Sequence, residues 1–239
     1  MIILGNPGVD IPGYLKIKRK LLNQASLLFM KLYLSSYRIG NDPKKLIELF
    51  SANKKAAVIA NAMDFLEKSE RDKNVKQEID DLTKLGLIPE ELDLRNYFNE
   101  SKDLNNKLNT YGLVWVRGGN TFILRRAMEQ SGFDKLLRKK IKDPDFVYAG
   151  YSAGACVISP TLYGLELVDN PHRIPAKYKS KVTWNGVGII DFFIVPHYRS
   201  NHQESHLVEK VVKYYIQKRM QFKTLRDGEV IVIAKSNKL

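Results

Sequence analysis

Short apolar segments alternate with amphipathic segments of helical length over most of the chain, beginning near Met30. The apolar segments are rich in β-branched and aromatic residues and are bounded by turn residues, which is typical of buried strands. They predict strands over residues 31–36, 56–61, 91–97, 113–120, 146–152, 191–198 and 229–234. The amphipathic segments predict helices over residues 43–50, 71–85, 121–130, 133–140 and 203–221. Buried strands that alternate with helices predict an α/β fold with a mostly parallel sheet covered on both faces.

The first 29 residues do not share this pattern. Gly5, Pro7, Gly8, Pro12 and Gly13 interrupt any early element, and a short basic and apolar segment follows them. We therefore predict that residues 1–29 are a peripheral extension and that residues 30–239 form a single domain.

The composition limits the class of protein. Lysine and arginine outnumber aspartate and glutamate by 39 to 26, a net charge of +13, but the basic residues are dispersed and show no nucleic-acid-binding signature. This pattern favours a solvated basic surface over a nucleic-acid partner. No stretch reaches the roughly 20 apolar residues of a membrane helix. Cys156 is the single cysteine, and no secretory leader opens the chain, so we expect a cytoplasmic location and no membrane association.

The segment Gly150-Tyr151-Ser152-Ala153-Gly154 follows the strand predicted over 146–152. Glycines on either side of Ser152 permit a sharp strand-to-helix turn that would project the serine hydroxyl above the sheet, the nucleophile-elbow pattern. The same spacing also occurs in a tight turn with a helix-capping serine. The motif leaves both interpretations open.

A second glycine loop, Arg117-Gly118-Gly119-Asn120-Thr121, ends another strand. Its glycines can turn backbone N–H groups toward an anion and let a substrate approach closely. A glycine turn followed by an asparagine helix cap is the structural alternative. The glycine spacings of the common nucleotide-binding loops are absent.

A serine nucleophile needs a base, and the chain has four histidines. His172 lies in a polar loop, and His202 and His206 lie at the start of the last long helix, where we expect them to face solvent. His197 lies at the carboxyl end of the strand predicted over 191–198, so its side chain would meet the same edge of the sheet as Ser152. It is the candidate base.

Three blocks resemble the dipeptidase E (aspartyl dipeptidase) and cyanophycinase family of serine peptidases: "RGGNTFILRRAM", "GYSAGACVISPT" and "GIIDFFIVPHY". "KLYLSSYRIGNDPKKL" and "LRDGEVIVI" resemble the beginning and the closing strand of that family, so the resemblance runs from about Met30 to the end. It implies a three-layer α/β/α sandwich similar to class I glutamine amidotransferase domains (flavodoxin-like), without cofactor or metal. It also implies a Ser-His-acid triad in which Ser152 is the nucleophile and His197 the base.

The resemblance places the triad acid in the segment "LYGLELVDNP", where Asp169 and Glu166 both qualify, and we prefer Asp169. The N–H of Ala153, with that of Gly118 or Gly119, would form the oxyanion hole. The expected function is hydrolysis of short peptides by a serine peptidase, acting as a monomer or a homodimer. The alternative is a non-catalytic domain that binds a peptide or a small anion.

Substrate specificity is where the chain departs from the family pattern. Aspartyl dipeptidases of this family use an arginine after the catalytic histidine to pair with the substrate carboxylate, and the corresponding position lies nearer His206. Arg199 is the first substitute, together with Asn120 as a substrate-binding residue, and Arg117 or Arg125 are further substitutes. Cys156 is expected to be a core residue, and serine rather than cysteine at the elbow argues against glutamine amidotransferase chemistry.

Overall fold

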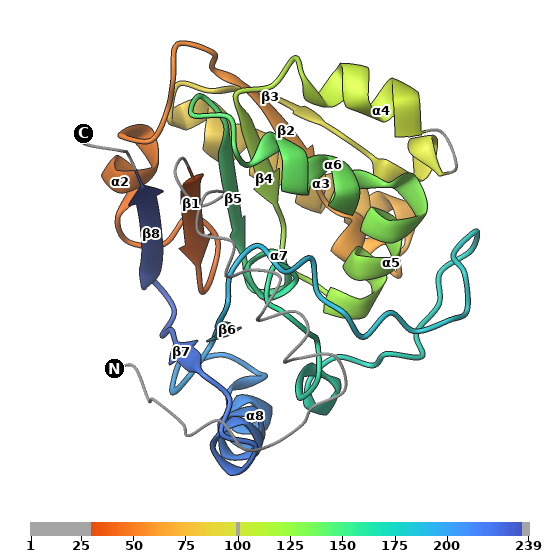
Figure 1. Ribbon diagram of the computed structural model, residues 1–239, viewed down its shortest axis with the longest axis vertical. Coiled ribbons are helices and arrows are strands. Elements are labelled where there is room, and N and C mark those ends of the chain that lie inside the picture. The colour runs from red at the N-terminus through yellow and green to blue at the C-terminus, as the bar shows by residue number, and fades with distance from the viewer. Residues whose placement is uncertain (1–29, 99–100, 236–239) are drawn as a thin grey trace.

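The computed structural model describes residues 30–98 and 101–235, so the predicted extension over residues 1–29 lies outside the described residues. A six-stranded sheet forms its centre, in the order β3-β2-β4-β5-β1-β8 (Figure 1). All neighbouring strands are parallel except the pair β1 and β8. The predicted α/β fold with a mostly parallel sheet is confirmed. The strands are β1 (Met30–Ser35), β2 (Lys55–Ile59), β3 (Ile88–Glu91), β4 (Leu113–Val116), β5 (Val147–Tyr151) and β8 (Val230–Lys235).

Successive residues of a strand point to opposite faces of the sheet, so these apolar strands present apolar side chains on both faces. Helices cover both faces. In β4, Trp115 packs in the cluster that contains residues of α2 (Pro43–Ile47) and α3 (Lys68–Lys84). Val116 packs on the other face, with residues of α4 (Ser101–Leu108), α5 (Thr121–Ser131) and α6 (Phe133–Lys140). The result is three layers, helix, sheet and helix.

A second, smaller unit lies beyond the carboxyl ends of the central strands (Figure 1). It pairs β6 (Phe193–Val195) in parallel with β7 (Phe222–Thr224), and α8 (Ser205–Gln217) packs against both through its own apolar cluster. The strand predicted over 191–198 therefore exists but does not belong to the main sheet. Neither β7 nor α4 was predicted.

The strand predicted over 91–97 is mostly wrong. Only Glu91 lies in β3, and residues Leu94–Tyr97 form a 3₁₀ helix, η3. The side chain of Asp93 accepts a hydrogen bond from the N–H of Arg95, and this local turn competes with an extended backbone. Within the described ranges, no helix has the length and apolar character needed to cross a membrane.

Candidate active site

Ser152 lies in the tight turn between β5 and the short helix α7 (Ala153–Cys156), with φ 47° and ψ −115°. This backbone conformation is strained for a non-glycine residue and costs on the order of 1–3 kcal/mol. Gly154 lets the turn pack against β4, because a Cβ atom there would lie 2.1 Å from the carbonyl oxygen of Val116. The Ser152 side chain makes no capping hydrogen bond to α7, so the helix-cap interpretation is wrong. The turn has the geometry of a nucleophile elbow.

The glycine loop after β4 packs against the turn at Ser152. A Cβ atom on Gly118 would lie 3.0 Å from the Cβ of Ser152, so the loop after β4 is in direct contact with the elbow. Gly119 has φ +139°, a conformation that favours glycine. The N–H groups of Gly118, Gly119 and Ala153 make no hydrogen bond with any other described residue. These are the N–H groups that the sequence analysis assigned to an oxyanion hole, and that role stays a prediction.

His197 follows β6 and is buried. Its Nδ1 lies 2.7 Å from Oδ1 of Asp227, in the loop between β7 and β8. Ser36, directly after β1, connects the two residues: its hydroxyl accepts from the N–H of His197 and donates to Asp227 Oδ1, both at 2.8 Å. The bond from its ring to Asp227 and the bond from its backbone N–H to Ser36 therefore hold His197 in place at the end of β1.

The predicted triad acid requires a correction, because neither Asp169 nor Glu166 bonds to His197. Asp169 accepts a hydrogen bond from the N–H of Thr121 at 2.8 Å, and Glu166 accepts from the N–H of Gly164 at 2.6 Å. The carboxylate partner is Asp227. It reaches the imidazole because β8 lies antiparallel to β1 and carries the preceding loop to the carboxyl end of β1.

His202, which the sequence predicts to face solvent, instead stacks on His197. The rings of His197 and His202 lie 3.7 Å apart at 8° to one another, and Tyr37 contacts both rings edge-on. Burial lowers the pKa of His197 below 6.5, and His202 lowers it further, against the opposing effect of Asp227. A lowered pKa keeps the imidazole neutral near pH 7, the form in which it can accept a proton.

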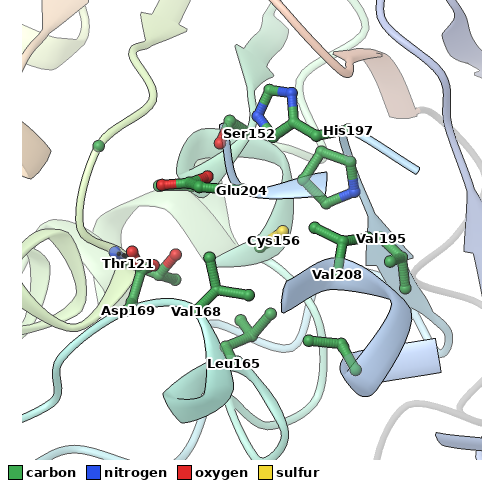
Figure 2. A pocket seen from close by; sticks show the side chains of 14 residues that line it. Thr121, Ser152, Cys156, Leu165, Val168, Asp169, Val195, His197, Glu204 and Val208 are labelled. Atoms are coloured by element: carbon green, nitrogen blue, oxygen red, sulfur yellow. Dashed lines mark hydrogen bonds between the residues drawn. The ribbon is translucent and has the colours of Figure 1, made fainter. Parts of the chain in front are cut away.

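Ser152 and His197 line one pocket, a cavity of about 30 Å³ (Figure 2). Figure 2 shows the Ser152 hydroxyl beside the His197 ring. The hydroxyl makes no hydrogen bond with the described residues, and catalytic hydrogen bonds of this kind commonly tighten only when substrate is bound. The remaining side chains in the pocket are carboxylates, Asp169 and Glu204, or largely apolar, among them Cys156, Leu165, Val168, Val195, Val208 and Val211.

The predicted substrate-binding side chains lie outside this lining. The Asn120 side chain accepts from the N–H groups of Phe122 and Ile123 and donates to the carbonyl oxygen of Asn170, so it caps α5. The Arg199 side chain is 62% exposed and pairs with Glu209 at 3.4 Å.

Cys156 forms part of the pocket floor and of the core, as predicted. It is buried, and its Sγ donates to the carbonyl oxygen of Ile194 at 3.4 Å. Burial raises the pKa of the Cys156 thiol far above its usual range. The thiolate that a cysteine nucleophile requires is therefore disfavoured.

One group of side chains could approach a metal ion. Ligand atoms of His197, His202 and Glu204 lie within 4.8 Å of one another. Zinc–nitrogen bonds are about 2.0–2.1 Å long and require lone pairs that converge on the ion. The parallel, stacked imidazole rings do not converge, so binding would require His202 to rotate away from His197.

Serine hydrolases of the α/β class place their nucleophile on a strand-to-helix turn like the one at Ser152. Comparison with known proteins narrows that class. The chain belongs to peptidase family S51, whose family model matches residues 40–238, and it is a serine peptidase.

Relatives and solved structures agree with this membership. The chain is 30% identical over 152 residues to the uncharacterized peptidase Lmo0363 of Listeria monocytogenes, which covers 64% of this chain and 70% of the relative. It is 25% identical over 158 residues to the uncharacterized peptidase PM1590 of Pasteurella multocida, over 64% and 72% of the two chains. The fold matches a candidate peptidase E protein from Listeria monocytogenes EGD-e with a TM-score of 0.66 and 25% identity, over 87% of this chain and 99% of that one. A peptidase from an acI-B1 actinobacterium matches in fold, with a TM-score of 0.65 and 16% identity over 87% and 85% of the chains.

Proposed function

We propose that this serine peptidase hydrolyses dipeptides and other short peptides through Ser152, His197 and Asp227. The observation that carries the proposal is the placement of three parts around one small pocket. They are a serine in a strained turn, an imidazole hydrogen-bonded to a carboxylate, and backbone N–H groups that donate to no described residue.

The chemistry follows from the roles of these groups. His197 accepts the proton of Ser152 as the serine oxygen attacks the scissile carbonyl carbon. Asp227 holds the proton-bearing Nδ1 of the ring and stabilises the imidazolium that forms. The N–H of Ala153, with that of Gly118 or Gly119, receives the negative charge on the tetrahedral oxygen. His197 then protonates the departing amine, and water activated by the same ring hydrolyses the acyl-enzyme.

The size of the pocket supports short substrates. A cavity of about 30 Å³ beside Ser152 accommodates a small group on the acyl side of the scissile bond. Loop residues and α8 close this cavity, because Leu165, Val168 and Val208 form its wall. The small space inside this wall supports short substrates over an extended polypeptide on the acyl side.

A dipeptide panel assayed with the wild type and with Ser152→Ala tests the proposal. We expect the wild type to release free amino acids and Ser152→Ala to be inactive with an unchanged melting transition. Peptide hydrolysis by Ser152→Ala, or peptide binding without cleavage by the wild type, would contradict it. A cytoplasmic location, an oligomeric state of one or two chains and the absence of a nucleic-acid partner stay predictions.

A further inference from the structure

Two carboxyl groups, and no arginine or lysine, line the described part of the pocket beside Ser152. They belong to Asp169, in the loop after η4 (Leu165–Leu167), and to Glu204, just before α8. Figure 2 shows the Glu204 carboxylate between Ser152 and the Asp169–Thr121 pair. The residues come from separate segments, yet their carboxyl groups share the space next to the nucleophile.

Both carboxyl groups are poorly stabilised as anions. Burial raises the pKa of Asp169 to about 7, and the nearby charge of Glu204 contributes to that increase. Burial also raises the pKa of Glu204. Thr121 opposes the increase at Asp169: its backbone N–H donates a hydrogen bond to Asp169 at 2.8 Å, and its side chain also lowers the pKa of Asp169. A cation placed between the two carboxyl groups would relieve both.

The described residues that line the pocket supply no such cation. The basic side chain beside Glu204 is His202, whose Nδ1 lies 3.9 Å from Glu204 Oε2. That same Nδ1 accepts from the backbone N–H of Glu204, so it presents no proton to the carboxylate. The three arginines considered for binding a substrate carboxylate are engaged elsewhere: Arg117 with Glu78 at 3.1 Å, Arg125 with Asp134 at 2.9 Å, and Arg199 with Glu209 at 3.4 Å.

This electrostatic pattern opposes an aspartyl side chain in the pocket. A substrate carboxylate would meet two carboxyl groups and no basic partner, whereas buried charges in proteins are normally paired. The cavity of about 30 Å³ has room for about two water-sized groups, which is less than a lysine or arginine side chain occupies. An ammonium group is the charged group that fits both the sign and the size.

Peptide geometry brings such a group to this place. In an amino-terminal residue, the α-amino nitrogen is two bonds from the carbonyl carbon. When that carbon lies over Ser152, the nitrogen is close enough to enter the pocket that Ser152, Asp169 and Glu204 line together.

We propose that Asp169 and Glu204 bind the free α-ammonium group of the substrate, and that the preferred amino-terminal residue is small and uncharged, not aspartate. This inference rests on the proposed function and adds the substrate class. The enzyme then cleaves the first peptide bond only where the amino terminus is free.

Four substrates separate the possibilities: Ala-Leu, N-acetyl-Ala-Leu, Asp-Leu and Lys-Leu. For the wild type we expect kcat/KM for Ala-Leu to exceed each of the other three by at least about 10-fold, the effect of losing or opposing one charged hydrogen bond. Comparable turnover of N-acetyl-Ala-Leu, or faster turnover of Asp-Leu, would overturn the inference. Fastest turnover of Lys-Leu would assign the pocket to a side-chain ammonium and would also overturn it.

Variants locate the effect. Glu204→Gln and Asp169→Asn should each raise KM for Ala-Leu by about 10-fold or more and shrink the ratio of Ala-Leu to N-acetyl-Ala-Leu cleavage. Glu70→Gln, which removes an exposed carboxylate on α3 outside the pocket, is the matched control and should leave both values unchanged. Thermal melts report whether each variant is folded, and because the ratio is measured within one variant it does not depend on the fraction folded. An unchanged ratio in both pocket variants would refute the role of these carboxyl groups.

Labelling of the wild type with a fluorophosphonate separates this inference from the proposed function. If Ser152 is labelled and the acetylated peptide is cleaved as fast as Ala-Leu, the serine peptidase mechanism stands and the α-ammonium site is wrong. If Ser152 is not labelled and no dipeptide is cleaved, both are wrong.

Discussion

Asp227→Asn removes the negative charge that holds His197 while preserving the shape of the side chain. Asp227 Oδ1 accepts from the imidazole Nδ1 at 2.7 Å and from the Ser36 hydroxyl at 2.8 Å. Asparagine can keep these contacts only if its oxygen faces both donors. If its NH₂ group faces Nδ1 instead, it stabilises the tautomer that cannot accept the Ser152 proton.

The size of the effect follows from these contacts. A hydrogen bond to a charged group contributes about 1.5–3 kcal/mol, which is about 10-fold to 150-fold in rate. The Asp227 side chain is 25% exposed, so solvent screens part of its charge. The tautomer effect adds to this loss of rate. In a serine protease of the chymotrypsin type, the equivalent change lowers kcat about 10,000-fold. We expect kcat to fall at least about 100-fold.

Dipeptide hydrolysis measured over a range of substrate concentrations separates kcat from KM. The matched control is Glu166→Gln, because Glu166 bonds to the N–H of Gly164 and lies outside the pocket lining. We expect kcat to fall in Asp227→Asn and to stay within a few-fold of wild type in Glu166→Gln. The reverse result, with Glu166→Gln inactive and Asp227→Asn within 10-fold of wild type, would refute the assignment of the acid.

Three further predictions concern the elbow, the stacked ring and pH. Gly154→Ala should lower the free energy of unfolding in urea by about 1–3 kcal/mol or more, since its Cβ would lie 2.1 Å from the Val116 carbonyl oxygen, and unchanged stability would contradict that close contact. His202→Phe keeps an aromatic ring on His197 but removes a titratable group that lowers its pKa, so the acidic limb of the kcat/KM profile should move to higher pH, and an unmoved limb would contradict the coupling. Because the pKa of Asp169 is raised to about 7, the folded state binds its proton more tightly than the unfolded chain, and stability should fall as pH rises from about 4 to about 7, by at most about 4 kcal/mol. Asp169→Asn should flatten that dependence in urea titrations at several pH values, and an equally steep decline would contradict it.

The main fold was predictable because its strands are buried on both faces. Segments such as 113–116 and 147–151 are continuous apolar runs, and these form the centre of the sheet. The sequence did not predict which strands pair in the small sheet of β6 and β7. The run over 193–195 is as apolar as a central strand, and only the tertiary structure shows that it pairs with β7.

Ser152 and His197 could be singled out from the sequence because each lies at or just after the end of an apolar strand. Ser152 has a glycine two residues away on either side, and His197 lies next to the end of the strand predicted over 191–198. Asp227 lies in "LRDG", which is indistinguishable in sequence from an ordinary turn. Its role depends on the antiparallel pairing of β8 with β1, a contact between the two ends of the domain. The available signal was an aspartate in the turn just ahead of the closing strand.

Ser36 and His202 were not identified for a similar reason. Ser36 directly follows β1, and its contacts with His197 and Asp227 join residues far apart in the sequence. His202 was placed on the surface from its position before an amphipathic helix. The loop after β6 instead brings the His202 ring onto the His197 ring.

Reaction of the wild-type protein with a fluorophosphonate, followed by peptide mapping, tests the central claim most directly. An activated serine predicts one covalent adduct, on Ser152, that does not form in Ser152→Ala or after denaturation and forms much more slowly in Asp227→Asn. No adduct on the folded wild type, or an adduct on a different residue, would show that Ser152 is not the nucleophile.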